Sequence, residues 1–512
     1  MEGNLASTLA VRADTYGWSD RPLFYADDTA ISHRKVHDAV TRASGVLHAA
    51  GVRRGHRVLI ALPDSVGFVA AFLGTLRLGA VAVLTGPEQS AAEHAYFLAD
   101  SAPQAAVCVP ELAPRFPSVH VLTADDLTDE PAALPEAAEV EPDAPAYVQY
   151  TSGTTGKPKG AVHRHADAEV YFEALGVGAL GITHEDVVFS LSKACYPFGL
   201  GASVFFPMLS GASSVLWSGP PGVVGAVEQA RAHRPTLFFT VPTWYARLAG
   251  ADPAVPVRAA FSSLRAAVSA GEPLLPSLAD RIEEVFGCPV LDGLGSTEVG
   301  HTFVSNTVSR RRRGALGVVL DPYEIEVRAE EHANGALPPY ARTAAPGEQG
   351  ILYVRGPSVM TEYLGKPDKT AEVLAPDGWL RTGDLVHADE DGFVHHHGRV
   401  LDQVTVSGER VSPLEIERVL GQYPGVVEVA VVGGTVPGEP LQAFAVLDTE
   451  LTPSDGLERE LISLARARLP EHKVPGSVTF MVELPRSGSG KVRREILGRG
   501  PGAGRDEDGS FR

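Results

Sequence analysis

The sequence is poor in cysteine. Its 512 residues include only Cys108, Cys195 and Cys288, which are widely spaced and form no CxxC pair. This pattern disfavours a disulfide framework and a cysteine-based zinc site, and it is typical of proteins from a reducing compartment. The first residues also lack a basic segment followed by an apolar run, so we expect no signal peptide and a cytoplasmic protein.

Positive charge is scarce as well. Lys and Arg number 44 against 63 Asp and Glu, which gives a net charge of -19. Binding to nucleic acid requires a basic field, so we do not expect a nucleic-acid partner. The most apolar stretch, residues 66–85, carries Arg77 and a break at Gly79. These features predict a buried helix followed by a strand rather than a membrane span.

Apolar residues are plentiful, at 44%, and the chain is too long for one typical core. Short β-branched runs alternate with longer amphipathic stretches. Strands are expected at residues 57–62, 80–84, 104–109 and 119–122, with a helix at 64–77. This alternation indicates the α/β class with parallel sheets. The acidic, proline-containing segment 124–145 indicates a surface connection.

Residues beyond about 400 carry a hydrophobic pattern of their own. Helices are expected at 414–423 and 457–469, and strands at 426–432, 442–447 and 478–482. About 110 residues with such a pattern can form a small independent domain. The tail from 498 to 512 is rich in Gly, Arg and Asp, and we expect it to be disordered.

The most informative segment is residues 150–160, YTSGTTGKPKG, which follows an apolar strand at 146–149. Glycines allow backbone N–H groups to approach a phosphate, hydroxyl groups donate hydrogen bonds to it, and lysine offsets its charge. Pro158 stands where a Walker motif needs Ser or Thr, so the segment is not a Walker loop. It predicts another kind of phosphate-binding loop, with a flexible surface loop as the alternative.

This segment resembles the phosphate-binding signature of the adenylate-forming superfamily, which includes acyl-CoA synthetases, peptide-synthetase adenylation domains and luciferases. Five further segments occur in the family's order, and the resemblance covers most of the chain. They are residues 269–273 (SAGEP), 292–298 (DGLGSTE), 381–384 (RTGD), 398–399 with Asp402, and 487–491 (SGSGK).

The resemblance implies a domain arrangement. Residues 1–398 would form the adenylation domain, with two layered α/β subdomains and a β-rich subdomain after residue 320. Residues 399–403 would act as a hinge at Asp402, and residues 404–497 would form a mobile α+β domain. Its rotation would bring a second face over the site for thiol attack. Many relatives read Gly-Arg-x-Asp-Asp-x-x-Lys here, whereas this chain has Leu401 and Thr405.

The resemblance also assigns nucleotide contacts. The residues implied to bind phosphate and nucleotide are Thr151, Ser152, Gly153, Thr154, Thr155, Lys159, Gly271, Glu272, Pro273, Asp292, Gly293, Leu294, Asp384 and Arg399. An ionised Asp384 could accept two hydrogen bonds from ribose hydroxyl groups, although a turn-capping aspartate is the simpler alternative. Arg399 offers a rigid fork of donors.

Three residues are implied to be catalytic. Glu298 would bind Mg²⁺, since magnesium sites often use only one or two protein carboxylates, and Thr297 would contact phosphate. Taken alone, the Thr-Glu pair would more often be a helix cap. Lys491 would bridge the carboxylate and the phosphate, because an ammonium group lowers the repulsion between two anions in the transition state.

The acid can be narrowed by a further resemblance. Residues 189–201 and 295–301 are similar to the benzoate-CoA ligase branch. The implied acyl pocket comprises Lys193, Tyr196, Phe198, Gly199, Ala270, Gly295 and His301. An aryl ring could stack on Phe198, although core packing would also explain both Phe198 and a satisfied His301. The polar residues at 193, 195 and 196 favour an amino or hydroxy substituent on the ring.

The predicted function is therefore activation of a carboxylic acid, most simply a substituted benzoate, with ATP and Mg²⁺, followed by transfer to coenzyme A. Alternatives are loading of a carrier protein, transfer to an amine, activation of nitrite for aryl-amine diazotisation, and a non-catalytic nucleotide-binding regulator. A homodimer is compatible with this function. Two clusters carry no site here: His395–His397 alternate between strand faces, and Arg310–Arg313 fit a solvated loop.

Overall fold

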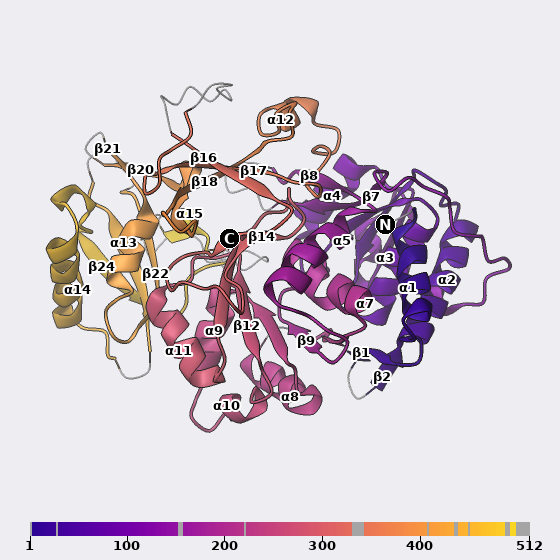
Figure 1. The fold of residues 1–512 in the computed structure, drawn as a ribbon, viewed down its shortest axis with the longest axis horizontal. Helices are drawn as coiled ribbons and strands as arrows, with labels where there is room; N and C mark the ends of the chain where they lie inside the picture. The colour runs from indigo at the N-terminus through magenta and orange to yellow at the C-terminus, as the bar shows by residue number, and fades with distance from the viewer. Residues whose placement is uncertain are drawn as a thin grey trace.

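The computed structural model describes residues 3–26, 29–151, 157–219, 222–329, 342–406, 409–434, 439–448, 451–486 and 492–497. The fold is mixed α/β, with several sheets and a separate small C-terminal domain, as the sequence predicted (Figure 1). The predicted disordered tail at 498–512 lies outside the described residues. Within them, no helix is both long enough and apolar enough to cross a membrane.

The first layer is a six-stranded sheet in the order β6-β5-β3-β4-β7-β8. Its strands are β3 (Arg57–Ala61), β4 (Val81–Thr85), β5 (Ala105–Cys108), β6 (His120–Leu122), β7 (Pro145–Tyr150) and β8 (Gly160–Arg164). All neighbours are parallel except β7 and β8. The helices of this part of the chain are α1 (Leu5–Thr15), α2 (His33–Ala49), α3 (Val66–Arg77) and α4 (Ala91–Ser101).

The apolar stretch 66–85 is a helix followed by a strand, α3 and β4, as predicted. The helix begins two residues later than expected because Ser65 caps it, accepting a hydrogen bond from the Phe68 amide (3.1 Å). The Asp64 carboxylate instead accepts a hydrogen bond from the Ala194 amide (2.9 Å). Asp64 thus ties the first sheet to the loop that follows a strand of the second.

The second layer is a nine-stranded sheet in the order β15-β14-β13-β12-β11-β9-β10-β1-β2. Its strands are β1 (Pro22–Ala26), β2 (Thr29–Ser32), β9 (Val187–Ser190), β10 (Ser213–Leu216), β11 (Leu237–Thr240), β12 (Ala266–Ala270), β13 (Val290–Gly295), β14 (Thr302–Ser305) and β15 (Val318–Val319). The central strands β9, β11, β12 and β13 are mutually parallel. All four residues of β11 are buried, as expected of a parallel strand covered on both faces.

Short and medium helices surround this sheet. They are α5 (Asp167–Tyr171), α6 (Pro197–Leu200), α7 (Phe206–Ser210), α8 (Val223–His233), α9 (Pro242–Ala249), α10 (Val257–Ala260) and α11 (Pro276–Phe286). Aromatic side chains fill the space between the two sheets. Tyr147 on β7 lies edge-on to Phe72 and approaches Tyr171, the two hydroxyl oxygens being 3.3 Å apart. The two sheets therefore share one core.

A four-stranded antiparallel sheet, β16-β17-β18-β19, follows residue 320, where the sequence predicted a β-rich subdomain. Its elements are β16 (Glu324–Arg328), β17 (Gly350–Arg355), α12 (Pro367–Ala371), β18 (Leu380–Ala388) and β19 (Val394–Arg399). His395 and His397 stack on His387, whereas His396 reaches Asp384. The histidine run thus alternates between strand faces, as a strand requires.

The C-terminal domain has its own core around Ile416, Val431 and Leu461. Its elements are β20 (Val404–Val406), β21 (Glu409–Val411), α13 (Pro413–Leu420), β22 (Val426–Val432), β23 (Gln442–Leu447), α14 (Asp455–Arg468), β24 (Ser477–Met481) and α15 (Arg494–Leu497). The helix predicted for 414–423 ends three residues early, because Gly421 caps it. Figure 1 shows α13 and β22 beside α11, where the Ser277 hydroxyl donates to the Gly421 carbonyl (2.8 Å).

Candidate active site

The predicted nucleotide segments meet at the carboxyl ends of β12 and β13. These strands are parallel neighbours, with Ser269 opposite Asp292 and Ala270 opposite Gly293. Because parallel strands end at the same edge of a sheet, the residues that follow them share that edge. Segments 269–273 and 292–298, far apart in the sequence, are thereby placed side by side.

The phosphate-loop segment follows β7. The Thr151 amide donates to the Lys159 carbonyl (2.9 Å), which closes the base of the turn. The predicted residues Ser152, Gly153, Thr154 and Thr155 lie outside the described residues. The Lys159 ammonium lies over the ring of Tyr363, 4.5 Å from its centroid. A cation on an aromatic face is favourable, so Tyr363 fixes the lysine beside the loop.

Tyr363 also contacts Glu298. Its hydroxyl donates to Glu298 Oε1 (2.6 Å), and the Met360 amide donates to the Glu298 carbonyl (2.7 Å). Lys159 and Glu298 therefore both contact one tyrosine, although they are 139 positions apart in the sequence. Sequence reasoning missed Tyr363, because a tyrosine in a charged segment carries no pattern that reveals a long-range contact.

Thr297 contacts a histidine on β8 of the six-stranded sheet. Its carbonyl oxygen lies 2.7 Å from His163 Nε2, and His163 Nδ1 lies 3.1 Å from a carboxylate oxygen of Asp167. The His163 ring is buried and stacks on Tyr147. This chain of contacts fixes the backbone of the Thr297–Glu298 pair against the aromatic core.

The donor set suits Mg²⁺. Tyr363 occupies Oε1 of Glu298, and within the described residues Oε2 accepts no hydrogen bond. A carboxylate oxygen is a hard ligand of the kind that Mg²⁺ prefers. No group of three or more His, Cys, Asp and Glu side chains in the described ranges is placed to hold a metal.

Asp384 and Arg399 lie directly opposite each other on β18 and β19. Arg399 Nε donates to Asp384 Oδ1 (3.1 Å), and His396 Nε2 lies 3.3 Å from the same oxygen. Burial alone would raise the pKa of Asp384, but the Arg399 guanidinium and His396 outweigh it and hold this pKa well below its ordinary value. Asp384 is therefore an ionised, buried acceptor.

Glu272 and Asp292 are half-buried carboxyl groups at the edge of the sheet. Glu272 accepts hydrogen bonds from the Thr243 amide (3.1 Å) and hydroxyl (2.6 Å), and burial raises its pKa. Burial also raises the pKa of Asp292 to about 8. Asp292 Oδ1 has no partner among the described residues, and Asp292 lines a cavity of about 240 Å³. Asp292 is thus suited to exchanging or donating a proton near neutral pH.

The arginine run beside that cavity is tied to carboxylates. Arg312 pairs with Asp389 and Asp391, and Arg313 pairs with Asp280 and Glu283. Exposed ion pairs of this kind contribute little to stability. Most of the run is exposed, as the sequence predicted for a solvated loop.

Aromatic rings surround His301. It stacks on Tyr171, with ring centroids 5.4 Å apart, and lies against Phe198 and Phe206. Its Nε2 lies 3.3 Å from the Phe198 carbonyl oxygen, and its buried Nδ1 has no partner among the described residues. Burial lowers the pKa of His301 to about 3, so the imidazole is neutral at physiological pH. A β-carbon at Gly201 would approach this ring to 2.3 Å, so glycine is needed there.

Two polar side chains lie near this cluster. Lys193 points away from the rings, and Gln149 was not predicted from the sequence. Lys193 Nζ donates to the carbonyl oxygens of Trp217 (3.0 Å) and Gly219 (3.2 Å), so its charge is not directed at the rings. Gln149 on β7 donates to the Cys195 carbonyl (3.2 Å), and its buried Oε1 has no partner in the described structure. Gln149 precedes the phosphate loop, where the apolar strand pattern concealed it.

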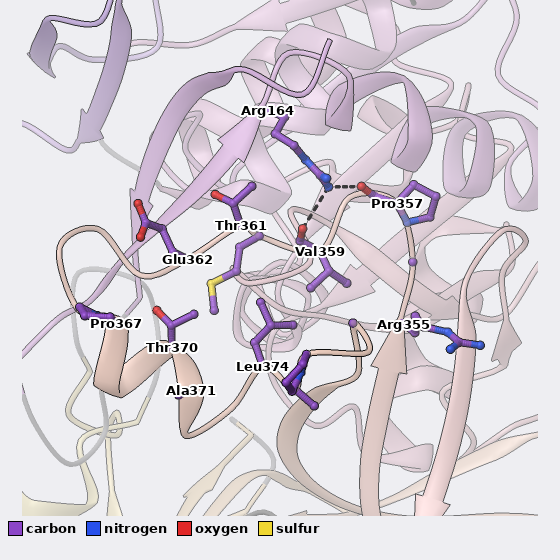
Figure 2. Close-up of a pocket in the computed structure, with 15 residues that line it drawn as sticks. Arg164, Arg355, Pro357, Val359, Thr361, Glu362, Pro367, Thr370, Ala371 and Leu374 are labelled. Carbon is purple, nitrogen blue, oxygen red and sulfur yellow. Dashed lines mark hydrogen bonds between the residues drawn. The ribbon is translucent and has the colours of Figure 1, made fainter. Parts of the chain in front are cut away.

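A cavity of about 670 Å³ lies between β8, α12 and residues 355–362. Figure 2 shows the residues that line it. Arg164 reaches into it, and its Nη2 donates to the carbonyl oxygens of Pro357 and Val359. None of the described residues that line it belongs to the predicted site. The cavity is therefore set apart from the site, although the Met360 amide in its wall bonds to Glu298.

Comparisons with known protein families identify two regions of the chain. The model of the AMP-binding enzyme family matches residues 11–364, and that of the AMP-binding enzyme C-terminal domain matches residues 415–491. Together these regions span most of the chain.

Several similar proteins are named as ligases of aromatic acids. The chain is 40% identical over 501 residues to the p-hydroxybenzoic acid–AMP ligase FadD22 of Mycobacterium tuberculosis, covering 97% of this chain and 68% of that protein. It is 33% identical to the 4-hydroxybenzoate–CoA/benzoate–CoA ligase of Rhodopseudomonas palustris, covering 96% and 93%. Among solved structures, a benzoate CoA ligase from Burkholderia xenovorans LB400 superimposes with a TM-score of 0.88 at 32% identity, covering 96% and 99%.

The buried histidine gives a test of pH dependence. The unfolded chain protonates His301 below about pH 6.5, whereas the folded chain does so only near pH 3, so falling pH favours unfolding. The stability from this neutral His301 is complete above pH 6.5 and is lost as the pH falls toward 3. At pH 5.5 the loss is about 1.4 kcal/mol.

Replacing His301 with Asn should therefore lower the melting temperature at pH 7.5 but reduce its further fall between pH 7.5 and 5.5. Differential scanning fluorimetry measures both values. His184→Asn, at an exposed position, serves as the control and should keep the wild-type difference. An equal fall in His301→Asn and wild type would show that His301 does not titrate as argued.

Proposed function

This chain belongs to the AMP-binding enzyme family, and from that premise we propose that it joins ATP and a hydroxy- or amino-substituted benzoic acid into an aroyl adenylate. The observation that carries the proposal is the adjacency of two chemistries along residues 295–301. Glu298, tied through Tyr363 to Lys159, lies on the same turn as His301, which is enclosed by aromatic rings. This adjacency supports a phosphate-binding site and an aryl-binding pocket that adjoin each other.

The first step is a displacement at phosphorus. A carboxylate oxygen of the acid attacks the α-phosphorus of ATP, forming a new P–O bond, while the bond to the β-phosphate oxygen breaks and pyrophosphate leaves. Both reactants are anions, so the rate depends on positioning and on compensating positive charge. Lys159 and the donors of segment 151–155 are proposed to hold the phosphates, with Thr297 beside them.

Glu298 is proposed to hold Mg²⁺, which would neutralise charge on the phosphates when bound. Asp384 is proposed to accept hydrogen bonds from the ribose hydroxyl groups, since the Arg399 guanidinium keeps it ionised. Segments 271–273 and 292–294 are proposed to flank the adenine. Lys491, outside the described residues, is proposed to bridge the two anions in the transition state.

The aryl ring is proposed to lie against Phe198 and His301, with Tyr196, Gly199, Ala270 and Gly295 completing the pocket. The neutral His301 can pair with a ring hydroxyl or amino group, or with the carboxylate. The two relatives are both named for 4-hydroxybenzoic acid, which supports such a ring substituent. Lys193 remains a candidate only if its ammonium leaves the Trp217 and Gly219 carbonyls.

The acceptor in the second step is proposed to be coenzyme A. Its thiolate would attack the acyl carbon, form a thioester and release AMP, after rotation of the small domain about Asp402. A second candidate is transfer to a carrier-protein thiol. Two observations favour it: the chain departs from the commoner hinge pattern at Leu401 and Thr405, and one relative is named as an acid–AMP ligase without coenzyme A.

Exchange of labelled pyrophosphate into ATP tests the first step. We expect strong exchange with hydroxybenzoates or aminobenzoates, weaker exchange with benzoate, and none with short fatty acids. Adding coenzyme A or a phosphopantetheinylated carrier protein then identifies the acceptor by thioester formation. Absence of exchange with every acid, together with nitrite-dependent release of AMP, would replace the carboxylate with nitrite as the activated anion.

Lys491 provides a test of the division between the two steps. Lys491→Ala should slow adenylation by orders of magnitude while leaving thioester formation from supplied aroyl adenylate within a few-fold of wild type, because its charge is needed only when two anions meet. Rapid-quench assays of the separate steps measure both rates. Arg493→Ala is the control, since the Arg493 side chain pairs with the exposed Glu495. Equal losses in both steps would contradict the assigned role.

A further inference from the structure

Arg486 is the last described residue before the segment that carries Lys491. Its side chain is 14% exposed and makes two ion pairs. Nη1 donates to Glu272 Oε1 (2.8 Å), and Nη2 donates to Glu428 Oε2 (2.9 Å). Glu428 lies on β22 in the small domain, whereas Glu272 belongs to the adenylation domain. One guanidinium therefore bridges the two domains.

Glu272 depends on this arginine. Its carboxylate is 12% exposed, and its other oxygen holds the amide and hydroxyl of Thr243 at the start of α9. Burial raises the pKa of Glu272, and the Arg486 charge opposes that rise. Removing one partner of a buried charge pair is costly because the remaining charge is left without compensation. The position of Arg486 is thus coupled to the charge of segment 269–273.

Arg486 is also anchored on its own side. It forms an antiparallel bridge with Val492, and the Arg493 amide donates to the Pro485 carbonyl (2.8 Å). Arg486 and Val492 flank residues 487–491 in the sequence. A contact that fixes Arg486 therefore fixes both flanks of the segment that contains Lys491.

Another ion pair across the same interface differs in its burial. Arg247 on α9 pairs with Glu483 (3.0 Å), but the two side chains are 39% and 73% exposed. Solvent screens such a pair, so it contributes little. The Arg247 pair is thus a matched control for the buried bridge, because it joins the same two domains a few residues away.

We infer that Arg486 is a positioning residue for the adenylate-forming step, because its pairing with Glu272 holds the small domain against segment 269–273. This inference rests on the function proposed above. Rotation for the second step must break the Arg486–Glu272 pair and can keep the Arg486–Glu428 pair. The Arg486–Glu272 pair therefore stabilises the domain arrangement of the first step relative to that of the second. A preference for one conformation requires such a difference in free energy.

The first experiment separates the half-reactions. Arg486→Gln should slow pyrophosphate exchange roughly 10²-fold, as expected for truncating one partner of a buried charge pair. Thioester formation from supplied aroyl adenylate should stay within a few-fold of wild type. Arg247→Gln should leave both steps near wild type. Equal losses in both steps, or an equal loss in Arg247→Gln, would overturn the inference.

Further variants isolate the pair from a folding defect. Glu272→Gln should slow exchange, and the Arg486→Gln/Glu272→Gln double variant should be no slower than the worse single variant, because one interaction is lost in all three. Arg486→Lys keeps the charge but not the two-pronged donor geometry, and it should give an intermediate rate with a near-wild-type melting temperature. Independent, additive losses would overturn the pairing even if Arg486→Gln folds poorly.

A distance measurement between the two domains tests the inference independently of catalysis. The three native cysteines are buried, so spin labels can be placed selectively at Val224→Cys and Val482→Cys, which are exposed positions in the two domains. With ATP and Mg²⁺ present, pulsed electron paramagnetic resonance should give one main distance in the otherwise native chain and a broader distribution after Arg486→Gln. An unchanged distribution would overturn the inference. Failure of wild-type exchange with every acid would instead count against the proposed function alone.

Discussion

Burial of carboxylate charge at the domain junction is the constraint on which the site depends. Asp384 and Glu272 are both removed from water, and an unpartnered charge there would be costly. Each is stabilised by an arginine from beyond residue 398, Arg399 and Arg486 respectively. The electrostatic environment of Asp384 thus depends on the end of β19, and that of Glu272 depends on where the small domain lies.

This dependence links the fold to the chemistry. The parallel sheet brings segments 269–273 and 292–298 to one edge, and the four-stranded sheet sets Asp384 opposite Arg399. Tyr363 then connects Glu298 with Lys159. Each link joins residues that are distant in the sequence through one buried or half-buried contact. The ion pair between Arg486 and Glu272 compensates a carboxylate charge in the folded chain. The same pair also favours one arrangement of the two domains.

The sequence predicted those features of the structure that depend on local residue patterns. Strand β22 and the helix and strand within 66–85 follow from apolar periodicity, and the family follows from six ordered motifs. Helix ends were less predictable, since Ser65 and Gly421 act through single capping contacts. Tyr363 and Arg486 were missed, because pairing between distant side chains leaves no periodic signal. Lys193 was assigned to the pocket by its neighbours, yet its ammonium binds two carbonyl oxygens.

Transfer of oxygen from the acid to AMP tests the central claim most directly. The enzyme would be incubated with ATP, Mg²⁺, the acceptor and 4-hydroxybenzoate labelled with ¹⁸O in its carboxylate, and the released AMP analysed by mass spectrometry. Attack of the carboxylate on the α-phosphorus predicts AMP that carries a single ¹⁸O atom. AMP released in the presence of the labelled acid but without the label would contradict formation of an aroyl adenylate.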